Sequence, residues 1–173
     1  MTARLRYRSP IGVLAIEASD DGILGVTFGD RGPSRPGPSA RARAHVDAAV
    51  AALDAYFAGR PPTLPALDLR GTPFQRAVWT ALVAIPWGEV RTYGELAEAV
   101  GAPGAARAIG GANHENPVAI LVPCHRVVRA GGALGGYAGG LEIKRWLLAH
   151  ETAHADALRL APGSPPRARA MRT

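Results

Sequence analysis

The run Ile120-Leu121-Val122-Pro123-Cys124-His125-Arg126-Val127-Val128 constrains the fold of this chain more than any other segment. Its aliphatic and β-branched residues predict a buried strand that leads into Cys124, so the fold has to place this cysteine at or beside the core. Cys124 is the only cysteine among the 173 residues. The chain therefore cannot form an internal disulfide, which is typical of proteins in a reducing compartment.

The pair Cys124-His125 makes this cysteine a candidate nucleophile. Thiolates rather than thiols perform nucleophilic chemistry, and an adjacent base lowers the free-energy cost of forming one. A free cysteine can equally be a small buried apolar residue without a chemical role. The pair by itself leaves both interpretations open, and the rest of the chain has to decide between them.

The chain is basic, with 20 Lys and Arg residues against 14 Asp and Glu residues and a net charge of +6. All of the basic residues except Lys144 are Arg, whose planar guanidinium suits contacts with phosphates and bases. Part of this charge lies in the stretch 159–172, so it favours a nucleic-acid partner only weakly. No apolar stretch has the length of a membrane span and no signal-peptide core follows Met1, so we predict a cytoplasmic protein without membrane contact.

Residues 1–70 predict a small domain of strands and one helix. Strands are expected at 5–7, 13–16 and 23–28, separated by turns rich in Gly, Pro, Ser and Asp. A helix is expected over 41–58 because one apolar stripe runs along it, formed by Val46, Val50, Leu53 and Phe57. Residues 61–71 are predicted to form an extended linker.

Residues 71–155 predict a second domain that is mostly helical. Thr72 followed by Pro73 is the pattern of a helix start, and this helix should end at Ile85-Pro86. Thr92-Tyr93-Gly94-Glu95 fits a capping box that opens a short helix to residue 100. A turn containing glycine leads to another short helix over 105–112, and two helices joined in this way fit a helix-turn-helix.

The end of the chain contributes a loop, a helix and a tail. The glycine-rich loop 135–140 carries Tyr137 and lacks the Gly-Lys-Ser/Thr ending of a phosphate loop. A last helix is expected over 141–150, ending beside Glu151, and residues 156–173 are predicted to be disordered. The predicted fold class is therefore α+β: a small antiparallel sheet with a helix, followed by a mostly helical domain that holds the cysteine.

Four motifs, in the same order and spacing, resemble the O6-alkylguanine-DNA alkyltransferases, the methylated-DNA–protein-cysteine methyltransferase family. They are Ala105-Ala106-Arg107-Ala108-Ile109-Gly110-Gly111-Ala112, Asn116-Pro117, Pro123-Cys124-His125-Arg126-Val127 and Gly136-Tyr137-Ala138-Gly139-Gly140-Leu141. The likeness runs from about residue 72 to 151 and is weaker over the N-terminal strands. It implies a ribonuclease-H-like N-terminal sheet without nuclease chemistry, and DNA repair by transfer of a methyl or larger alkyl group from O6 of guanine to Cys124. Whether O4 of thymine is also a substrate is left open.

The resemblance also implies how the thiol is prepared. His125 would activate Cys124 through a water molecule, and Glu151 would orient His125. Asn116 would hold the active-site backbone together by hydrogen bonds. A soft thiolate suits displacement at an alkyl carbon better than a hydroxyl does, and nothing in the chain regenerates the thiol from the thioether, so each molecule would act once.

Base recognition would fall on the residues after the cysteine. By resemblance, Tyr137 would donate a hydrogen bond to the departing guanine, and the backbone around Val127 and Ala138 would read the base edge. Some relatives have a serine at the position of Ala138, which bears on the size of alkyl group accepted. Taken alone, Tyr93 and Tyr137 are better explained as packing residues. Asn116 is then a turn residue before proline and Glu151 a solvated charge, and only the joint spacing of the four favours the functional interpretation.

The DNA surface is expected on the second helix of the helix-turn-helix. Arg107 would fill the gap left by the flipped nucleotide, and Tyr93 would press on the neighbouring phosphate. Small residues would line the minor-groove face: Ala106, Ala108 and Gly110. The expected partner is double-stranded DNA carrying O6-alkylguanine, bound through its minor groove by a monomer. Whether several molecules bind cooperatively along the DNA is left open. No cofactor is expected and no metal either, because the zinc-binding cysteines of some relatives are missing here.

Three other functions compete with this interpretation. A non-catalytic protein that binds alkylated DNA would have another residue in place of Cys124. A helix-turn-helix transcription regulator fits poorly, because no dimerisation helix is evident. A Cys-His hydrolase would need a histidine across a cleft and an oxyanion hole, and neither is evident in the sequence.

Overall fold

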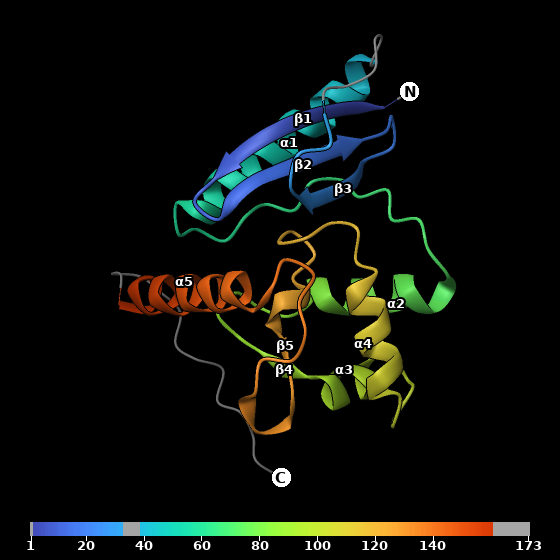
Figure 1. Cartoon of the computed structure of the whole chain (residues 1–173), viewed down its shortest axis with the longest axis vertical. Coiled ribbons are helices and arrows are strands. Elements are labelled where there is room, and N and C mark those ends of the chain that lie inside the picture. Colours follow the sequence, from blue (N-terminus) through green and yellow to red (C-terminus); the bar gives the residue numbers. More distant parts are fainter. Residues whose placement is uncertain (1, 33–38, 161–173) are drawn as a thin grey trace.

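The computed structural model describes residues 2–32 and 39–160 of the chain, with the elements labelled in Figure 1. The strands are β1 (Ala3–Ser9), β2 (Gly12–Ala18), β3 (Ile23–Phe28), β4 (Arg91–Thr92) and β5 (Val127–Val128). The helices are α1 (Ala40–Phe57), α2 (Pro73–Val83), α3 (Tyr93–Ala99), α4 (Ala106–His114) and α5 (Leu141–Leu160). Two short 3₁₀ turns, Cys124–Arg126 and Ala130–Gly132, complete the set. No helix in the described part of the chain is long and apolar enough to cross a membrane.

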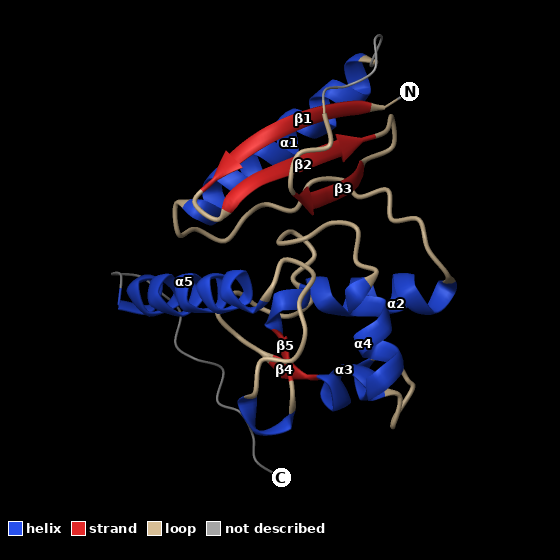
Figure 2. Cartoon of the chain, in the orientation of Figure 1, coloured by secondary structure: helices blue, strands red, loops and turns tan. Residues whose placement is uncertain are grey.

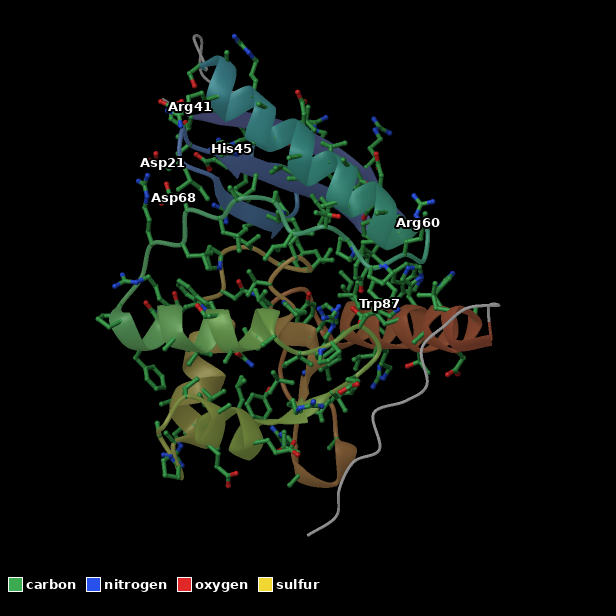
Figure 3. All side chains as sticks on the ribbon, turned by 180° about the vertical axis from the view of Figure 1, so that it is seen from behind. Asp21, Arg41, His45, Arg60, Asp68 and Trp87 are labelled. Carbon is green, nitrogen blue, oxygen red and sulfur yellow. The ribbon has the colours of Figure 1, made fainter. Side chains whose placement is uncertain are left out.

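The N-terminal half is a three-stranded antiparallel sheet in the order β1-β2-β3, covered on one face by α1 (Figures 1 and 3). Turns of a few residues connect the strands, as hairpins require. Helix α1 begins at Ser39, whose hydroxyl accepts a hydrogen bond from the backbone N–H of Ala42. The three strands and α1 were all predicted, with ends that differ from the prediction by two residues or fewer.

The C-terminal half is built from helices α2 to α5, of which α3 and α4 are short and α5 is long, and from a small parallel pair of strands (Figure 2). Thr72 caps α2 in a complete capping box with Gln75, and Pro73 is its first residue. Thr92 and Glu95 form the predicted capping box of α3. Helices α3 and α4 pack on each other through a tight turn, in agreement with the two short helices predicted here. The predicted α+β fold class is confirmed.

The apolar run before Cys124 is not a strand, and this prediction was wrong. Ile120 has a φ of 72°, a left-handed conformation that breaks an extended chain. The backbone instead folds into turns, in which the N–H of Val122 donates to the carbonyl of Val118. The run is apolar because residues 118–128 are all buried, and burial alone does not distinguish a strand from a buried turn.

Helix α5 is longer than predicted. It continues past Glu151 to Leu160, so Glu151 lies within the helix rather than after it, and the first five residues of the predicted disordered tail are helical. The rest of that tail, residues 161–173, lies outside the described residues. No glycine or proline interrupts 141–160, which is the local reason that the helix continues.

One hydrophobic core joins the two halves. Buried side chains from the sheet, α1, α2 and the turns before Cys124 form a single cluster. The backbone of β3 pairs directly with the second half, because the N–H of Val26 donates to Pro117 and the N–H of Ala119 donates to Val26. The sheet edge is thereby held against the segment that leads into Cys124.

Candidate active site

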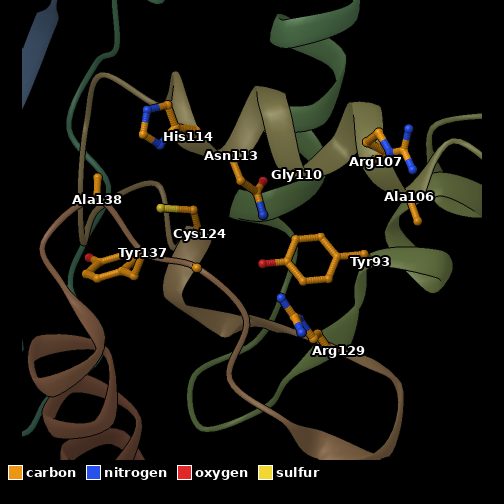
Figure 4. Close-up of a pocket in the computed structure, with 11 residues that line it drawn as sticks. Tyr93, Ala106, Arg107, Gly110, Asn113, His114, Cys124, Arg129, Tyr137 and Ala138 are labelled. Carbon is orange, nitrogen blue, oxygen red and sulfur yellow. The ribbon is translucent and has the colours of Figure 1, made fainter.

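Cys124 lies in the wall of a pocket of about 440 Å³ in the C-terminal half. Figure 4 shows its side chain with Tyr137 and Ala138 on one side and Tyr93 and Arg129 on the other. Helix α4 forms a further wall, contributing Ala106, Arg107, Gly110, Asn113 and His114. A pocket of this volume is large enough for a small-molecule group or a single base.

Cys124 is 6% exposed, and its thiol accepts a hydrogen bond from a side-chain amide. Asn116 donates from Nδ2 to the Cys124 sulfur at 3.1 Å and to the carbonyl of Val122 at 2.8 Å, while its Oδ1 accepts from the N–H of Val118. Burial raises the pKa of Cys124 above its ordinary value, and the Asn116 hydrogen bond and the positive charge of Lys144 oppose that rise. Forming a thiolate here therefore requires a base.

His125 is fully buried behind Cys124 and contacts Glu151. Its Nε2 lies 2.6 Å from Oε1 of Glu151, and burial lowers its pKa so that the ring is neutral near pH 7. Since Glu151 is a carboxylate, Nε2 must carry the ring proton and Nδ1 the lone pair. Nδ1 has no hydrogen-bond partner within the described residues, so it is the ring atom available to accept a proton.

Glu151 receives donors from four different residues. Besides His125, Arg126 donates from Nε at 2.8 Å and from Nη2 at 3.1 Å, Tyr56 donates from its hydroxyl at 2.9 Å, and the N–H of Gly88 donates at 3.2 Å. Gly88 has a φ of 73°, and a Cβ there would lie 2.6 Å from that of Ala155 on α5. Only glycine therefore brings this N–H so close to the carboxylate.

The pKa of Glu151 is lowered by these contacts. Burial would raise it, but the hydrogen bonds and charges of His125 and Arg126 outweigh burial and bring it to about 2. The carboxylate therefore stays ionised and does not take the proton from His125. It orients the ring and stabilises the imidazolium when one forms.

Lys144, the only lysine of the chain, is fully buried beside the same site. Its ammonium donates to the carbonyls of Val127 at 2.6 Å and Gly136 at 3.3 Å and to that of Leu134. It thus ties the loop that carries Tyr137 to the strand that follows Cys124. Burial lowers its pKa to about 8, so it is still mostly protonated at neutral pH and places a positive charge near the thiol.

The predicted DNA-facing residues lie at the mouth of the pocket, with one exception. Ala106, Arg107, Gly110 and Tyr93 line it, and Arg107 is exposed on α4. Ala108 is exposed on the same helix but does not line the pocket. The hydroxyl of Tyr93 lies against the loop after Cys124, where a Cβ on Gly135 would be 2.6 Å from it.

The predicted base-reading residues separate into two positions. Tyr137 and Ala138 line the pocket, and the Tyr137 hydroxyl is buried without a partner among the described residues. Val127 is buried behind Cys124, and its carbonyl accepts from Lys144. Asn116, His125 and Glu151 lie behind or beside the thiol rather than in the mouth of the pocket.

Seven residues of the site were not assigned from the sequence: Tyr56, Gly88, Asn113, His114, Arg126, Arg129 and Lys144. Arg126 follows His125 directly, and Lys144 is the only lysine, so both were visible as unusual residues. Arg129 lies next to Tyr93 at the mouth of the pocket (Figure 4). Tyr56 lies one position from the predicted apolar stripe of α1, and no local pattern connects it with Glu151.

We expect the free energy of unfolding to decrease as the pH is lowered. The unfolded chain protonates His125 near pH 6.5 and Glu151 near pH 4.5, whereas the folded chain resists both because both folded pKa values are lowered. Stability should therefore decline below about pH 6.5 and fall further between about pH 4.5 and pH 2. Urea unfolding at a series of pH values measures this, and a constant stability from pH 7 to pH 3 would contradict it.

The fold and the site define a class of protein: an α+β chain with a buried cysteine next to a His–Glu pair. This cysteine lines a pocket that is also lined by the short helix α4. Comparison with known proteins gives the family. Residues 73–153 match the model described as the 6-O-methylguanine DNA methyltransferase DNA-binding domain. The chain is 52% identical over 159 residues to a methylated-DNA–protein-cysteine methyltransferase of Mycolicibacterium paratuberculosis, covering 88% of this chain and 96% of that one. It belongs to the methylated-DNA–protein-cysteine methyltransferase family.

Solved structures agree with this assignment. The fold matches the crystal structure of Mycobacterium tuberculosis O6-methylguanine methyltransferase with a TM-score of 0.76 and 43% identity, over 94% of this chain and 96% of that one. It also matches Mycobacterium tuberculosis OGT in complex with DNA, with a TM-score of 0.75 and 45% identity over 86% and 92% of the two chains. The resemblance stated from the sequence motifs is thus confirmed.

Proposed function

We propose that this protein repairs DNA by direct reversal, accepting the alkyl group of O6-alkylguanine on Cys124. The observation that carries the proposal is the position of the only cysteine of the chain, in the wall of a base-sized pocket and backed by His125 and Glu151. The relatives are named as protein-cysteine methyltransferases, and this chain offers a single cysteine for that role. A cytoplasmic location belongs to the same proposal, since a reduced thiol is required.

The DNA would be bound through its minor groove by α4. Next to Arg107, the exposed positions Ala108 and Gly111 are small, so the helix backbone can approach the duplex closely there. His114 is exposed at the end of the same helix. The target base cannot react while stacked, and extruding it costs a few kcal/mol. Arg107 inserted into the gap would offset part of that cost. We propose that a monomer is the active form, since the fold of one chain already brings the thiol, the His125–Glu151 pair and the walls of the pocket together.

The reaction would be one in-line displacement. The thiol proton leaves toward His125 through a water molecule, as in the resembling family, and the sulfur attacks the alkyl carbon. The S–C bond forms as the O6–C bond breaks, and the bonding electron pair goes to O6 of guanine. The guanine remains part of the DNA strand, and it is neutral once a proton equivalent to the one lost by the thiol has reached its ring nitrogen. The thioether has no good leaving group, so the protein acts once.

Tyr137 would stabilise the departing base. Its hydroxyl is buried without a partner, and burial followed by the charges of Cys124 and Glu151 raises its pKa well above 10, so it is a donor at all relevant pH values. We expect Tyr137→Phe to slow transfer by about 10²-fold, the effect typical of removing one donor to a developing oxyanion. Unfolding free energy should stay equal or rise, because a buried unsatisfied hydroxyl is removed. Single-turnover kinetics and urea unfolding of the same samples measure both, and an unchanged rate would exclude this role.

The proposed function is tested by mass spectrometry after mixing the protein with a duplex that carries one O6-methylguanine. A single methyl group on the Cys124 peptide, saturating at one per protein, is the expected result. Unmodified Cys124 despite tight and selective binding of this duplex would indicate a damage sensor instead. Repeated turnover on a small thioester would indicate a hydrolase.

A further inference from the structure

Tyr56 belongs to the N-terminal half, yet its hydroxyl lies within hydrogen-bond distance of both His125 and Glu151. It is 2.9 Å from Oε1 of Glu151 and 3.4 Å from Nε2 of His125, and Oε1 is the same oxygen that His125 contacts. The matched family domain begins at residue 73, so Tyr56 lies outside it. We propose that Tyr56 is a positioning residue for alkyl transfer, which acts on His125 through Glu151. This inference rests on the proposed function above.

Packing holds the Tyr56 ring in one place. The side chain is fully buried, its backbone carbonyl accepts from Nε2 of His150 at 2.7 Å, and its ring meets the edge of Trp87 with 5.1 Å between centroids. Figure 3 shows Trp87 between the end of α1 and α5. The position of Tyr56 on α1 and its contacts with Trp87 and with His150 on α5 therefore fix the direction of the hydroxyl. A buried donor held in this way fixes the geometry of its hydrogen-bond partner.

The Tyr56 hydroxyl is a permanent donor. Burial, and then the negative charge of Glu151, raise its pKa far above the ordinary value, so the proton stays on the phenol. The phenol oxygen itself then has no negative charge with which to attract a proton to His125. Its effect must pass through Glu151, by fixing Oε1 and by taking part of the carboxylate's negative charge.

The electrostatic surroundings of His125 are few and can be named. The charged and titratable groups that face it are Glu151 and Lys144 on α5, Arg126 and Cys124 on its own turn, Tyr137 on the loop and Tyr56 on α1. Removing the Tyr56 donor leaves more of the charge of Glu151 to act on His125. The pKa of His125 should then rise, and the ring should be less firmly held with Nδ1 free.

The test is Tyr56→Phe, assayed for single-turnover methyl transfer between about pH 5 and pH 9. Glu151 keeps its donors from His125, Arg126 and Gly88, so the variant is expected to fold. The maximal rate should fall by about tenfold, a fraction of what general-base catalysis supplies as a whole. The acid limb of the pH–rate profile should move to higher pH by about half a unit or more.

Tyr7→Phe is the matched control. The Tyr7 hydroxyl on β1 donates at 2.7 Å to Asp54, which lies on α1 like Tyr56 but away from the pocket. The substitution therefore also removes a hydrogen bond from a tyrosine hydroxyl to a carboxylate. It should change stability without moving the acid limb. A Tyr56→Phe protein that is folded and has the wild-type rate and pH profile would overturn the proposal, and so would an equal change in Tyr7→Phe. Absence of methyl transfer by the wild-type protein would instead refute the proposed function.

A second variant tests the proposal even if Tyr56→Phe fails to fold. Replacing Tyr56 with 3,5-difluorotyrosine retains the ring and the hydroxyl but makes the hydroxyl a stronger donor. The acid limb should then move to lower pH, opposite to Tyr56→Phe. A shift in the same direction for both variants, or for neither, would overturn the proposal.

Discussion

Cys124→Ala is expected to abolish alkyl transfer while leaving binding to the alkylated duplex intact. The substitution removes the only atom in the chain able to form the thioether, so the rate should fall by at least roughly three orders of magnitude. Binding should persist because Arg107 and the other lining residues of α4 remain in place. Mass spectrometry of the treated protein and a fluorescence titration with the same duplex measure the two properties.

Cys124→Ser separates chemistry from shape. The hydroxyl can still accept from Asn116, but it is a harder and far less acidic nucleophile, so it should be as inactive as alanine. An alanine variant that still removed the methyl group from DNA would contradict the acceptor role of Cys124. Loss of binding together with transfer, in a folded variant, would contradict the separation of the DNA surface from the thiol.

Glu151→Gln is expected to lower the unfolding free energy by about 3–5 kcal/mol, the cost of leaving a buried charge without its partner. Arg126 is only 7% exposed, and its Nε and Nη2 both donate to Glu151, so a neutral amide leaves the guanidinium uncompensated. The same variant should transfer the alkyl group slowly, because a glutamine amide can present its N–H₂ to Nε2 of His125 and favour the wrong tautomer. Urea unfolding and single-turnover kinetics give both values.

Glu142→Gln provides the control on the same helix. Glu142 pairs with Arg145, but both side chains are largely exposed, and an exposed pair contributes about 0–1 kcal/mol. Its replacement should leave stability and transfer close to wild type. Equal losses in the two variants would show that the Glu151 network has no special place in this fold.

The helix starts of the C-terminal half were predicted well because their signals are local. Thr72 and Thr92 cap the N–H groups of residues three positions later, and such contacts form wherever the chain turns into a helix. The strands of the first sheet were likewise predicted from short apolar segments and the turn residues that separate them. Local hydrogen bonding decides these features, so a single sequence contains them.

The prediction of a strand before Cys124 was wrong for the opposite reason. Its apolar residues report burial, and the sequence contains no mark of the left-handed turn at Ile120. Asn116 and the pairing of Val26 with this segment supply the hydrogen bonds that a strand partner would otherwise give. Burial can be satisfied by a strand or by a supported turn, and only the surrounding elements choose between them.

The amino-acid sequence by itself therefore determined the local elements and the reactive groups available. These are one thiol with a histidine beside it, together with the motifs that indicate the family. The tertiary structure decided which groups form the buried network behind that thiol. Tyr56 and Glu151 are 95 residues apart, and Arg126 and Lys144 became parts of the site only when α5 packed against the turn of Cys124. Caps and turns depend on neighbours within a few residues, whereas a buried charge network depends on how whole elements pack, so it takes form only in the folded protein.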